Sequence, residues 1–261
     1  MYGDGALAIS AEAPSAVTSD RLFPLVPAEL ASRVGAKRLL DVAVAVLLLV
    51  ALAPVIAVVA LAIKLDSRGP ILYRCRRVGF RGEELEMLKF RKMADGAAGP
   101  GLTAANDLRL TRCGRFLAAT KLDELPQLWH VLEGEMSLVG PRPEDPEFAA
   151  VHLADYESIV KVKPGITGLS QLAFARETTI LDPEDTISGY LSRLLPAKVQ
   201  LDLLYARNRS FRMDLWILAW TAVAVVFRRD VAVNRGSGHL GLRRRARPNP
   251  SLPSKEAEVS C

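Results

Sequence analysis

The chain has 261 residues, of which 50% are hydrophobic and 24% are charged. This composition excludes a wholly disordered chain and a collagen-like fibre, and three separated cysteines exclude a disulfide scaffold and fit a reducing compartment. The net charge of +5 favours an anionic partner, which could be nucleic acid, an acidic lipid or a phosphorylated substrate.

Both ends of the chain lack hydrophobic periodicity. Residues 1–32 are rich in Ala, Ser and Pro, and they contain no signal peptide because no basic segment precedes an apolar one. Residues 233–261 are rich in Gly, Arg and Pro. We expect both segments to be disordered tails, the second one basic enough to contact anionic lipid.

An apolar run extends from Val42 to Ile63 and would be about 33 Å long as a helix, which is enough to cross a bilayer. Pro54 stands near its middle, and Lys and Arg residues flank both of its ends. A proline bends a helix, and a spanning helix normally shows unequal basic flanks. We therefore expect residues 33–66 to form a re-entrant membrane hairpin that breaks at Pro54. A single spanning helix is the alternative.

The segment after the apolar run predicts a strand pair and then a helix. ILYRCRRV and ELEMLKFRKM are β-prone and flank the turn GFRG, and residues 94–105 read as a loop. LDELPQLWHVLEG has helical apolar spacing. Pro126 fits only its first turn, so Asp123 is the expected N-cap, and Gly134 is the expected end.

The rest of the chain is mainly helical in pattern. We expect helices around FAAVHLADYESIV and over residues 186–208, the latter broken near Pro196. FRMDLWILAWTAVAVVFRR is too short to span a membrane and favours an interfacial helix anchored by Trp216 and Trp220. The predicted fold is α+β and mostly helical, with a catalytic domain over residues 67–232.

One acidic pair is the strongest candidate for chemistry. Asp123 and Glu124 are adjacent and lie between a basic stretch and the rigid turn GPRPE, which carries Arg142. Two carboxylates beside several cations suit phosphoryl transfer, because one can attack phosphorus or hold Mg²⁺ while the cations bind phosphate. The alternatives are structural: the acids could simply cap a helix, and Arg142 could pair with Glu144.

The order of these segments resembles one protein family. The apolar run KRLLDVAVAVLLLVALAPVIAVVALAIK, the motif KFRKM, the stretch LDELPQLWHVLEGEMSLVGPRPE and the loop KPGITG occur in the order found in the bacterial sugar transferases, the monotopic phosphoglycosyl transferases. The resemblance covers residues 35–230. It implies an enzyme on the cytoplasmic face of a bacterial inner membrane that uses Mg²⁺ to transfer a phosphosugar from a UDP-sugar to polyprenyl (undecaprenyl) phosphate, releasing UMP. This would be the first membrane step of exopolysaccharide, O-antigen or glycoprotein glycan assembly.

The resemblance also implies roles for individual residues. Asp123 matches the nucleophile that carries the phosphosugar covalently, and Glu124 matches the second acid, expected near Mg²⁺ together with Asp123. The remaining matched or nearby candidates for phosphate or substrate binding are Arg91, Arg115, Lys121, Arg142, Gln171 and Asp202.

The chain departs from the family pattern in three places. Ala118 stands where an Arg is usual, and Arg115 or Lys121 could take its place. Ala53 replaces a Ser before the membrane proline, and Arg176 is shifted by one position in a loop that bears on sugar choice. A non-catalytic membrane adaptor is therefore the alternative function. No nucleic-acid-binding motif supports a nucleic-acid partner. The sugar, the pathway and a homodimer stay open.

Overall fold

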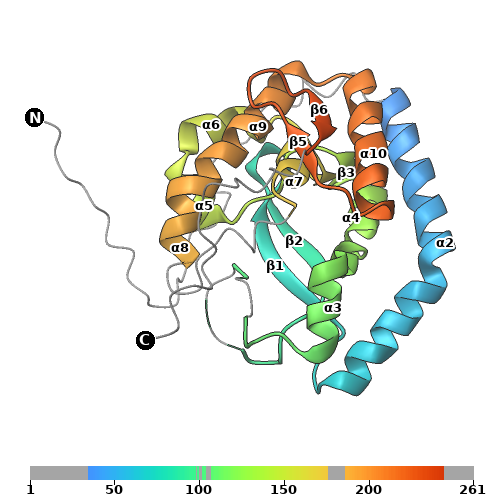
Figure 1. Cartoon of the computed structure of the whole chain (residues 1–261). Coiled ribbons are helices and arrows are strands. Elements are labelled where there is room, and N and C mark those ends of the chain that lie inside the picture. The colour runs from blue at the N-terminus through green and yellow to red at the C-terminus, as the bar shows by residue number, and fades with distance from the viewer. Residues whose placement is uncertain (1–34, 98, 100–101, 104–106, 176–185, 244–261) are drawn as a thin grey trace, which may run out of the picture.

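The computed structural model describes residues 35–97, 99, 102–103, 107–175 and 186–243, so the expected N-terminal tail and Arg176 lie outside the described residues. The described chain is a mostly helical α+β domain, as expected. Its helices surround three small sheets, where one strand pair was expected (Figure 1). Its helices are α2 (Gly35–Asp66), α3 (Arg112–Thr120), α4 (Gln127–Glu133), α5 (Pro146–Val151), α6 (Leu153–Ile159), α7 (Leu169–Ala173), α8 (Thr186–Gly189), α9 (Leu195–Asn208) and α10 (Phe211–Val226). Its strands are β1 (Leu72–Val78), β2 (Glu84–Phe90), β3 (Ser137–Val139), β4 (Gly165–Thr167), β5 (Val231–Val233) and β6 (Leu240–Leu242).

Helix α2 is long and apolar enough to cross a membrane by length and composition. It is one continuous helix through Pro54, and it runs along one side of the domain and changes direction on the way (Figure 1). The expected break at Pro54 is therefore absent from the backbone, and the re-entrant path of α2 in a membrane stays a prediction. A proline removes one helical hydrogen bond and bends the helix, and the hydrogen bonds of the neighbouring turns are enough to continue it.

The N-terminal end of α2 is docked on the domain by polar contacts. Lys37 Nζ lies 2.7 Å from Asp214 Oδ2 of α10. The buried carboxylate of Asp41 accepts hydrogen bonds from the Ser137 hydroxyl (2.8 Å) and the Leu138 backbone N–H (3.2 Å) of β3. Arg38 donates to the Leu132 carbonyl at the end of α4 (2.8 Å). These contacts fix the first turns of α2 against β3, α4 and α10.

The C-terminal end of α2 is docked on the same domain. Val59 and Ile63 are buried with Phe90 of β2 and Leu117 of α3 in one apolar cluster. Between the two docked ends, α2 presents apolar side chains to solvent: Val46, Leu47, Val50, Val55, Val58 and Leu61. The helix is therefore fixed at both ends and apolar on its outer face.

The expected strand pair is confirmed. Strands β1 and β2 are antiparallel, with Leu72 opposite Phe90 and Val78 opposite Glu84. The turn between them places Arg81 at a φ of 61°. Strands β3 and β4 are parallel and align Ser137 with Gly165. The segment KPGITG, expected to be a loop, thus contains a strand, and the pair brings it next to the loop after β3, which carries Arg142.

The helix expected from LDELPQLWHVLEG is shorter than predicted. Helix α3 ends at Thr120, Lys121 takes a left-handed conformation (φ 60°), and Leu122–Glu124 form a single 3₁₀ turn. Helix α4 begins only after Pro126, so the N-cap role expected for Asp123 is wrong. Gly134 ends α4 with a φ of 89°, as expected. The left-handed residue separates α3 from the acidic turn and sets the acids apart from both helices.

The C-terminal half differs from expectation in its breaks. The helix around FAAVHLADYESIV is divided at His152 into α5 and α6. A π-helical segment, Tyr190–Leu194, lies before α9, where a break near Pro196 was expected. Pro196 itself lies in the first turn of α9, where the backbone N–H that proline lacks has no partner within the helix.

The expected disorder from residue 233 is wrong for residues 233–243. Strands β5 and β6 pair antiparallel, and Val231 and Leu240 are buried in the main hydrophobic core. Alternating apolar residues around the sharp turn at Gly238 (φ 71°) supply the pattern of a hairpin. Residues 244–261 lie outside the described residues.

Candidate functional site

Asp123 and Glu124 lie side by side in the 3₁₀ turn between α3 and α4, and the two acids face different cations. Glu124 Oε1 accepts a hydrogen bond from Arg142 Nη2 (3.3 Å) and lies 3.7 Å from Lys89 Nζ of β2. Asp123 Oδ2 lies 3.9 Å from Lys92 Nζ, just beyond β2. The fold thus joins the acidic pair to cations from two other segments.

Burial alone would raise the pKa of Glu124, but the charges of Arg142 and Lys89 outweigh it and lower the pKa to about 2. Glu124 is therefore ionised at neutral pH. The alternative that Arg142 pairs with Glu144 does not describe the structure, in which Glu144 accepts hydrogen bonds from the Tyr190 hydroxyl and the Asp145 backbone N–H.

Asp123 is only 4% exposed, and burial raises its pKa above the usual range, while the charge of Lys92 acts against that rise. Its buried Oδ1 has no hydrogen-bond partner among the described residues. A buried carboxylate oxygen without a partner is costly for folding alone and is common at sites where a ligand supplies the partner. The side chain is therefore poised to act on something bound beside it.

Arg142 is held by a loop whose backbone packs very closely. Gly165 donates its backbone N–H to the Pro141 carbonyl (2.8 Å), and Gly140 donates to the Thr167 carbonyl (2.9 Å). A Cβ atom on Gly165 would lie 2.0 Å from the backbone nitrogen of Gly140. Only glycine permits this approach, which places Arg142 opposite the acidic turn.

Asp202 lies behind that loop and does not contact the acidic pair in the described structure. Its carboxylate accepts the Ser170 hydroxyl (2.7 Å) and the backbone N–H of Arg142. Gln171 donates to the Gly165 carbonyl (3.1 Å). Both residues therefore support the Arg142 loop, and their expected substrate-binding role stays a prediction.

The substitution Asp202→Asn is expected to flatten the pH dependence of stability. Burial raises the pKa of Asp202 to about 7 from 3.8, while Ser170 acts against that rise. The folded chain therefore keeps a proton that the unfolded chain loses, and the free energy of unfolding falls from about pH 4 to about pH 7 and then levels. Urea unfolding across this range measures the slope. Asp155→Asn, at a half-buried position on α6, should keep the wild-type slope, and an equal slope in Asp202→Asn would contradict the assignment.

Three other expected residues form no ion pair with either acid in the described part of the chain. Arg91 donates to the Ser67 carbonyl (2.9 Å) and to the Arg68 carbonyl, so it fixes the end of α2. Arg115 lines a cavity of about 550 Å³ beside Asp66, at the start of α3. Lys121 is exposed, although its charge lowers the pKa of both acids.

Lys89 and Lys92 are the site residues that sequence reasoning missed. Both belong to KFRKM, the motif from which only Arg91 was expected to take part. The sequence feature that could have indicated them is the number of basic residues in the motif itself. Which of its cations face the acids depends on where β2 ends and on the contact of Arg91 with α2.

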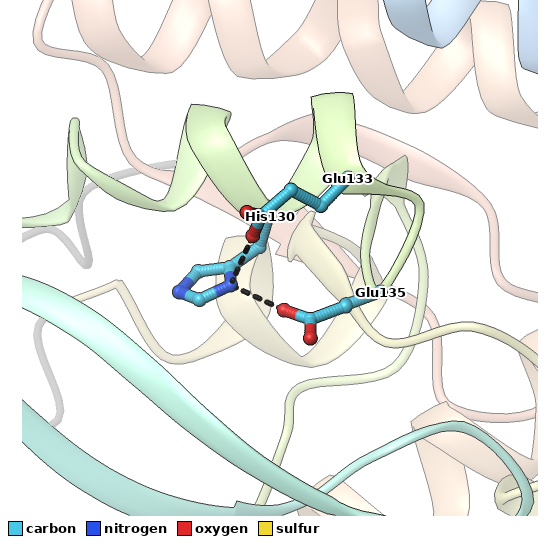
Figure 2. A group of neighbouring side chains, drawn as sticks. All are labelled: His130, Glu133 and Glu135. Atoms are coloured by element: carbon cyan, nitrogen blue, oxygen red, sulfur yellow. Dashed lines mark hydrogen bonds and ion pairs between the residues drawn. The ribbon is translucent and has the colours of Figure 1, made fainter.

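A second cluster of possible metal ligands consists of His130, Glu133 and Glu135, whose ligand atoms lie close to one another (Figure 2). The imidazole is already committed, because its Nε2 accepts the Leu88 backbone N–H (3.1 Å). Its Nδ1 therefore carries the proton and donates to Glu135 Oε2 (2.6 Å). A metal would need one of these nitrogens, so the group serves to join α4 to β2.

Comparisons with known proteins show which family the sequence resembles. The sequence profile of the bacterial sugar transferases matches residues 32–228. A UDP-glucose:undecaprenyl-phosphate glucose-1-phosphate transferase of Klebsiella pneumoniae is 39% identical over 71% of this chain and 39% of its own length. An undecaprenyl-phosphate glucose phosphotransferase of Komagataeibacter xylinus is 40% identical over 74% of this chain and 36% of its own length. A UDP-glucose:undecaprenyl-phosphate glucose-1-phosphate transferase of Caulobacter vibrioides is 38% identical over 73% of this chain and 69% of its own length. The chain thus spans less than half the length of the first two relatives.

Proposed function

The chain belongs to the bacterial sugar transferase family, and on that basis we propose that it transfers a sugar phosphate from a UDP-sugar to polyprenyl phosphate and releases UMP. The observation that carries the proposal is the buried Asp123, which has one oxygen without a partner and stands beside an ionised Glu124 and the cations Lys89, Lys92 and Arg142. The names of the relatives support the donor and acceptor classes.

The chemistry follows from these charges. Asp123 attacks the sugar-bearing phosphorus, the bond between that phosphorus and the bridging oxygen breaks, and UMP leaves with the electron pair. The product is an acyl phosphate, in which the carboxylate of Asp123 carries the phosphosugar. An oxygen of polyprenyl phosphate then attacks the same phosphorus, which restores Asp123 and forms polyprenyl diphosphate sugar. Cations are required because the phosphoryl group carries negative charge throughout.

Mg²⁺ fits the acidic pair, which offers the unpartnered Oδ1 of Asp123 and the carboxylate of Glu124. Mg²⁺ usually takes one or two carboxylates together with substrate phosphates, and here it would neutralise phosphate charge. Lys89 and Arg142 already balance Glu124, so the donor phosphates would supply the remaining ligands.

Removing divalent cations with EDTA is therefore expected to lower UMP release by about 10²-fold or more, and added Mg²⁺ should restore it. The measurement is UMP release by detergent-extracted protein. Added Ca²⁺ is the control for an effect of charge alone, because Ca²⁺ favours more ligands at longer distances than this pair offers. Full activity in EDTA would contradict the proposed metal.

The fold supports attachment to one face of a membrane. Both ends of α2 dock on the same domain, so a crossing of the bilayer would separate two contacts that the structure joins. Helix α10 adds exposed Leu215 and Trp216, and its Trp216 and Trp220 stack edge-on 6.2 Å apart. We propose that α2 is re-entrant, that α10 lies in the interface, and that the domain sits on the cytoplasmic face of a bacterial inner membrane.

Labelling of single cysteines introduced at Gly35 and Arg68, at the two ends of α2, tests this arrangement. In sealed inverted vesicles made from a variant whose native cysteines are replaced, both sites are expected to react with an impermeant maleimide. In vesicles of the opposite orientation neither site should react. Reaction of the two sites from opposite faces would show a spanning helix.

A panel of UDP-sugars tests the function itself. With Mg²⁺ and polyprenyl phosphate, one donor is expected to release UMP in a manner that depends on the lipid. The alternative, a non-catalytic membrane adaptor, is favoured only by Ala118. The adaptor would be supported if folded protein released UMP from no donor and the variant Ala118→Arg also released none.

A further inference from the structure

We propose that Lys92 is a further substrate-binding residue, which pairs with Asp123 before the reaction and with the transferred phosphoryl group once Asp123 carries that group as an acyl phosphate. The proposal rests on the phosphosugar transfer proposed above. Lys92, which lies just after β2, would thus have the phosphate-binding role that the sequence led us to expect of Arg115 or Lys121.

The cations around the acidic pair divide their contacts. Arg142 and Lys89 both face Glu124. Lys92 forms the ion pair with Asp123, at 3.9 Å, and its side chain is 26% exposed while that of Asp123 is 5% exposed. Among the described residues, Lys92 is the one cation within ion-pair distance of the proposed nucleophile. Its partial exposure leaves room for a ligand that enters from solvent.

The backbone of Lys92 is fixed by α3. Its carbonyl accepts the Thr111 backbone N–H (3.1 Å), and the next residue, Met93, bridges to Leu110. A Cβ atom on Gly114 would lie 1.7 Å from the Lys92 carbonyl oxygen, so α3 approaches this point only because it carries glycine there. Thr111 and Gly114 thus hold Lys92 in place relative to the acidic turn that follows α3.

The charge balance of the reaction explains why a lysine suits this place. Before the donor binds, the negative charge near Lys92 is on the Asp123 carboxylate. After attack, that carboxylate is a neutral acyl group, and the negative charge is on the oxygens of the bound phosphoryl group. A flexible ammonium with three donors can move from the first to the second without gaining or losing a proton.

The experiment compares Lys92→Ala, Lys92→Gln and Lys92→Arg with the wild type, using the UDP-sugar that the wild type turns over. UMP release is measured without polyprenyl phosphate as a single turnover and with it at steady state. We expect Lys92→Ala and Lys92→Gln to slow the single turnover by about 10²-fold, with a smaller change in KM. Lys92→Arg, which keeps the charge, should restore at least a tenth of the wild-type rate. Lys161→Ala, at an exposed lysine, is the matched control and should leave the rate unchanged.

The thermal unfolding midpoint separates a chemical effect from misfolding. If Lys92→Ala is unstable, Lys92→Gln keeps the length of the side chain and carries the test. A wild-type single-turnover rate in a folded Lys92→Gln would overturn the proposal, and so would an equal loss in Lys92→Arg. Failure of the wild type to release UMP from any donor would instead remove the proposed function itself.

Discussion

The substitution Asp123→Asn is expected to reduce UMP release by about 10³-fold or more, because an amide cannot form the acyl phosphate on which the proposed reaction depends. The protein should remain folded. Asp123 is buried, and burial raises its pKa, so a neutral side chain of the same shape removes a charge that the fold does not favour. The free energy of unfolding should therefore change by no more than about 1 kcal/mol.

Two measurements together check this expectation. UMP release reports the chemistry, and intact-protein mass after incubation with the donor alone reports a covalent phosphosugar, which the wild type should carry and Asp123→Asn should lack. Asp155→Asn provides a matched substitution on α6, where the side chain is 43% exposed, and it should behave as the wild type. Undiminished turnover in Asp123→Asn would refute the assignment of the nucleophile.

The substitution Gly165→Ala is expected to cause a large loss of stability, about 3 kcal/mol or more. The new Cβ would lie 2.0 Å from the Gly140 backbone nitrogen and 2.6 Å from its Cα. Backbone atoms cannot move aside as the end of a side chain can, so β3 and β4 must separate. That separation would also displace Arg142 from Glu124, and the remaining folded protein should lose turnover.

Urea unfolding of the detergent-solubilised protein gives the loss of stability, and UMP release per folded molecule gives the loss of turnover. The control is Gly241→Ala in β6, where a new Cβ would meet nothing within 4 Å. That variant should unfold at the wild-type urea concentration or slightly above it. Wild-type stability in Gly165→Ala would show that the two loops can separate without cost.

Several parts of the fold could be read from the sequence because local patterns determine them. Strong β-propensity on either side of GFRG predicted the β1–β2 pair, and the apolar run from Val42 to Ile63 predicted α2. Gly134 ended α4 as expected, because a glycine readily takes a left-handed conformation. The adjacent acids Asp123 and Glu124 were also visible as a candidate site.

Other parts were decided by packing between distant segments. The sequence suggested a hairpin at Pro54, a helix cap at Asp123 and disorder after residue 233. The structure has a continuous α2, a separate acidic turn, and a hairpin whose Val231 and Leu240 join the main core. For the acidic turn and the terminal hairpin, burial against another segment outweighed the local preference, as it often does for short elements. At Pro54, where α2 is exposed, the hydrogen bonds of the neighbouring turns continue the helix.

The sequence by itself indicated phosphoryl transfer. Two neighbouring carboxylates near a basic motif and a rigid arginine turn are residue types that suit the binding and transfer of a phosphate group in any fold. The tertiary structure decided which cation serves which acid. Arg91 donates a hydrogen bond to the Ser67 carbonyl just after α2, while Lys89 faces Glu124 and Lys92 faces Asp123. That division could not be read from KFRKM, because ion pairing depends on distances between segments that only the folded chain brings together.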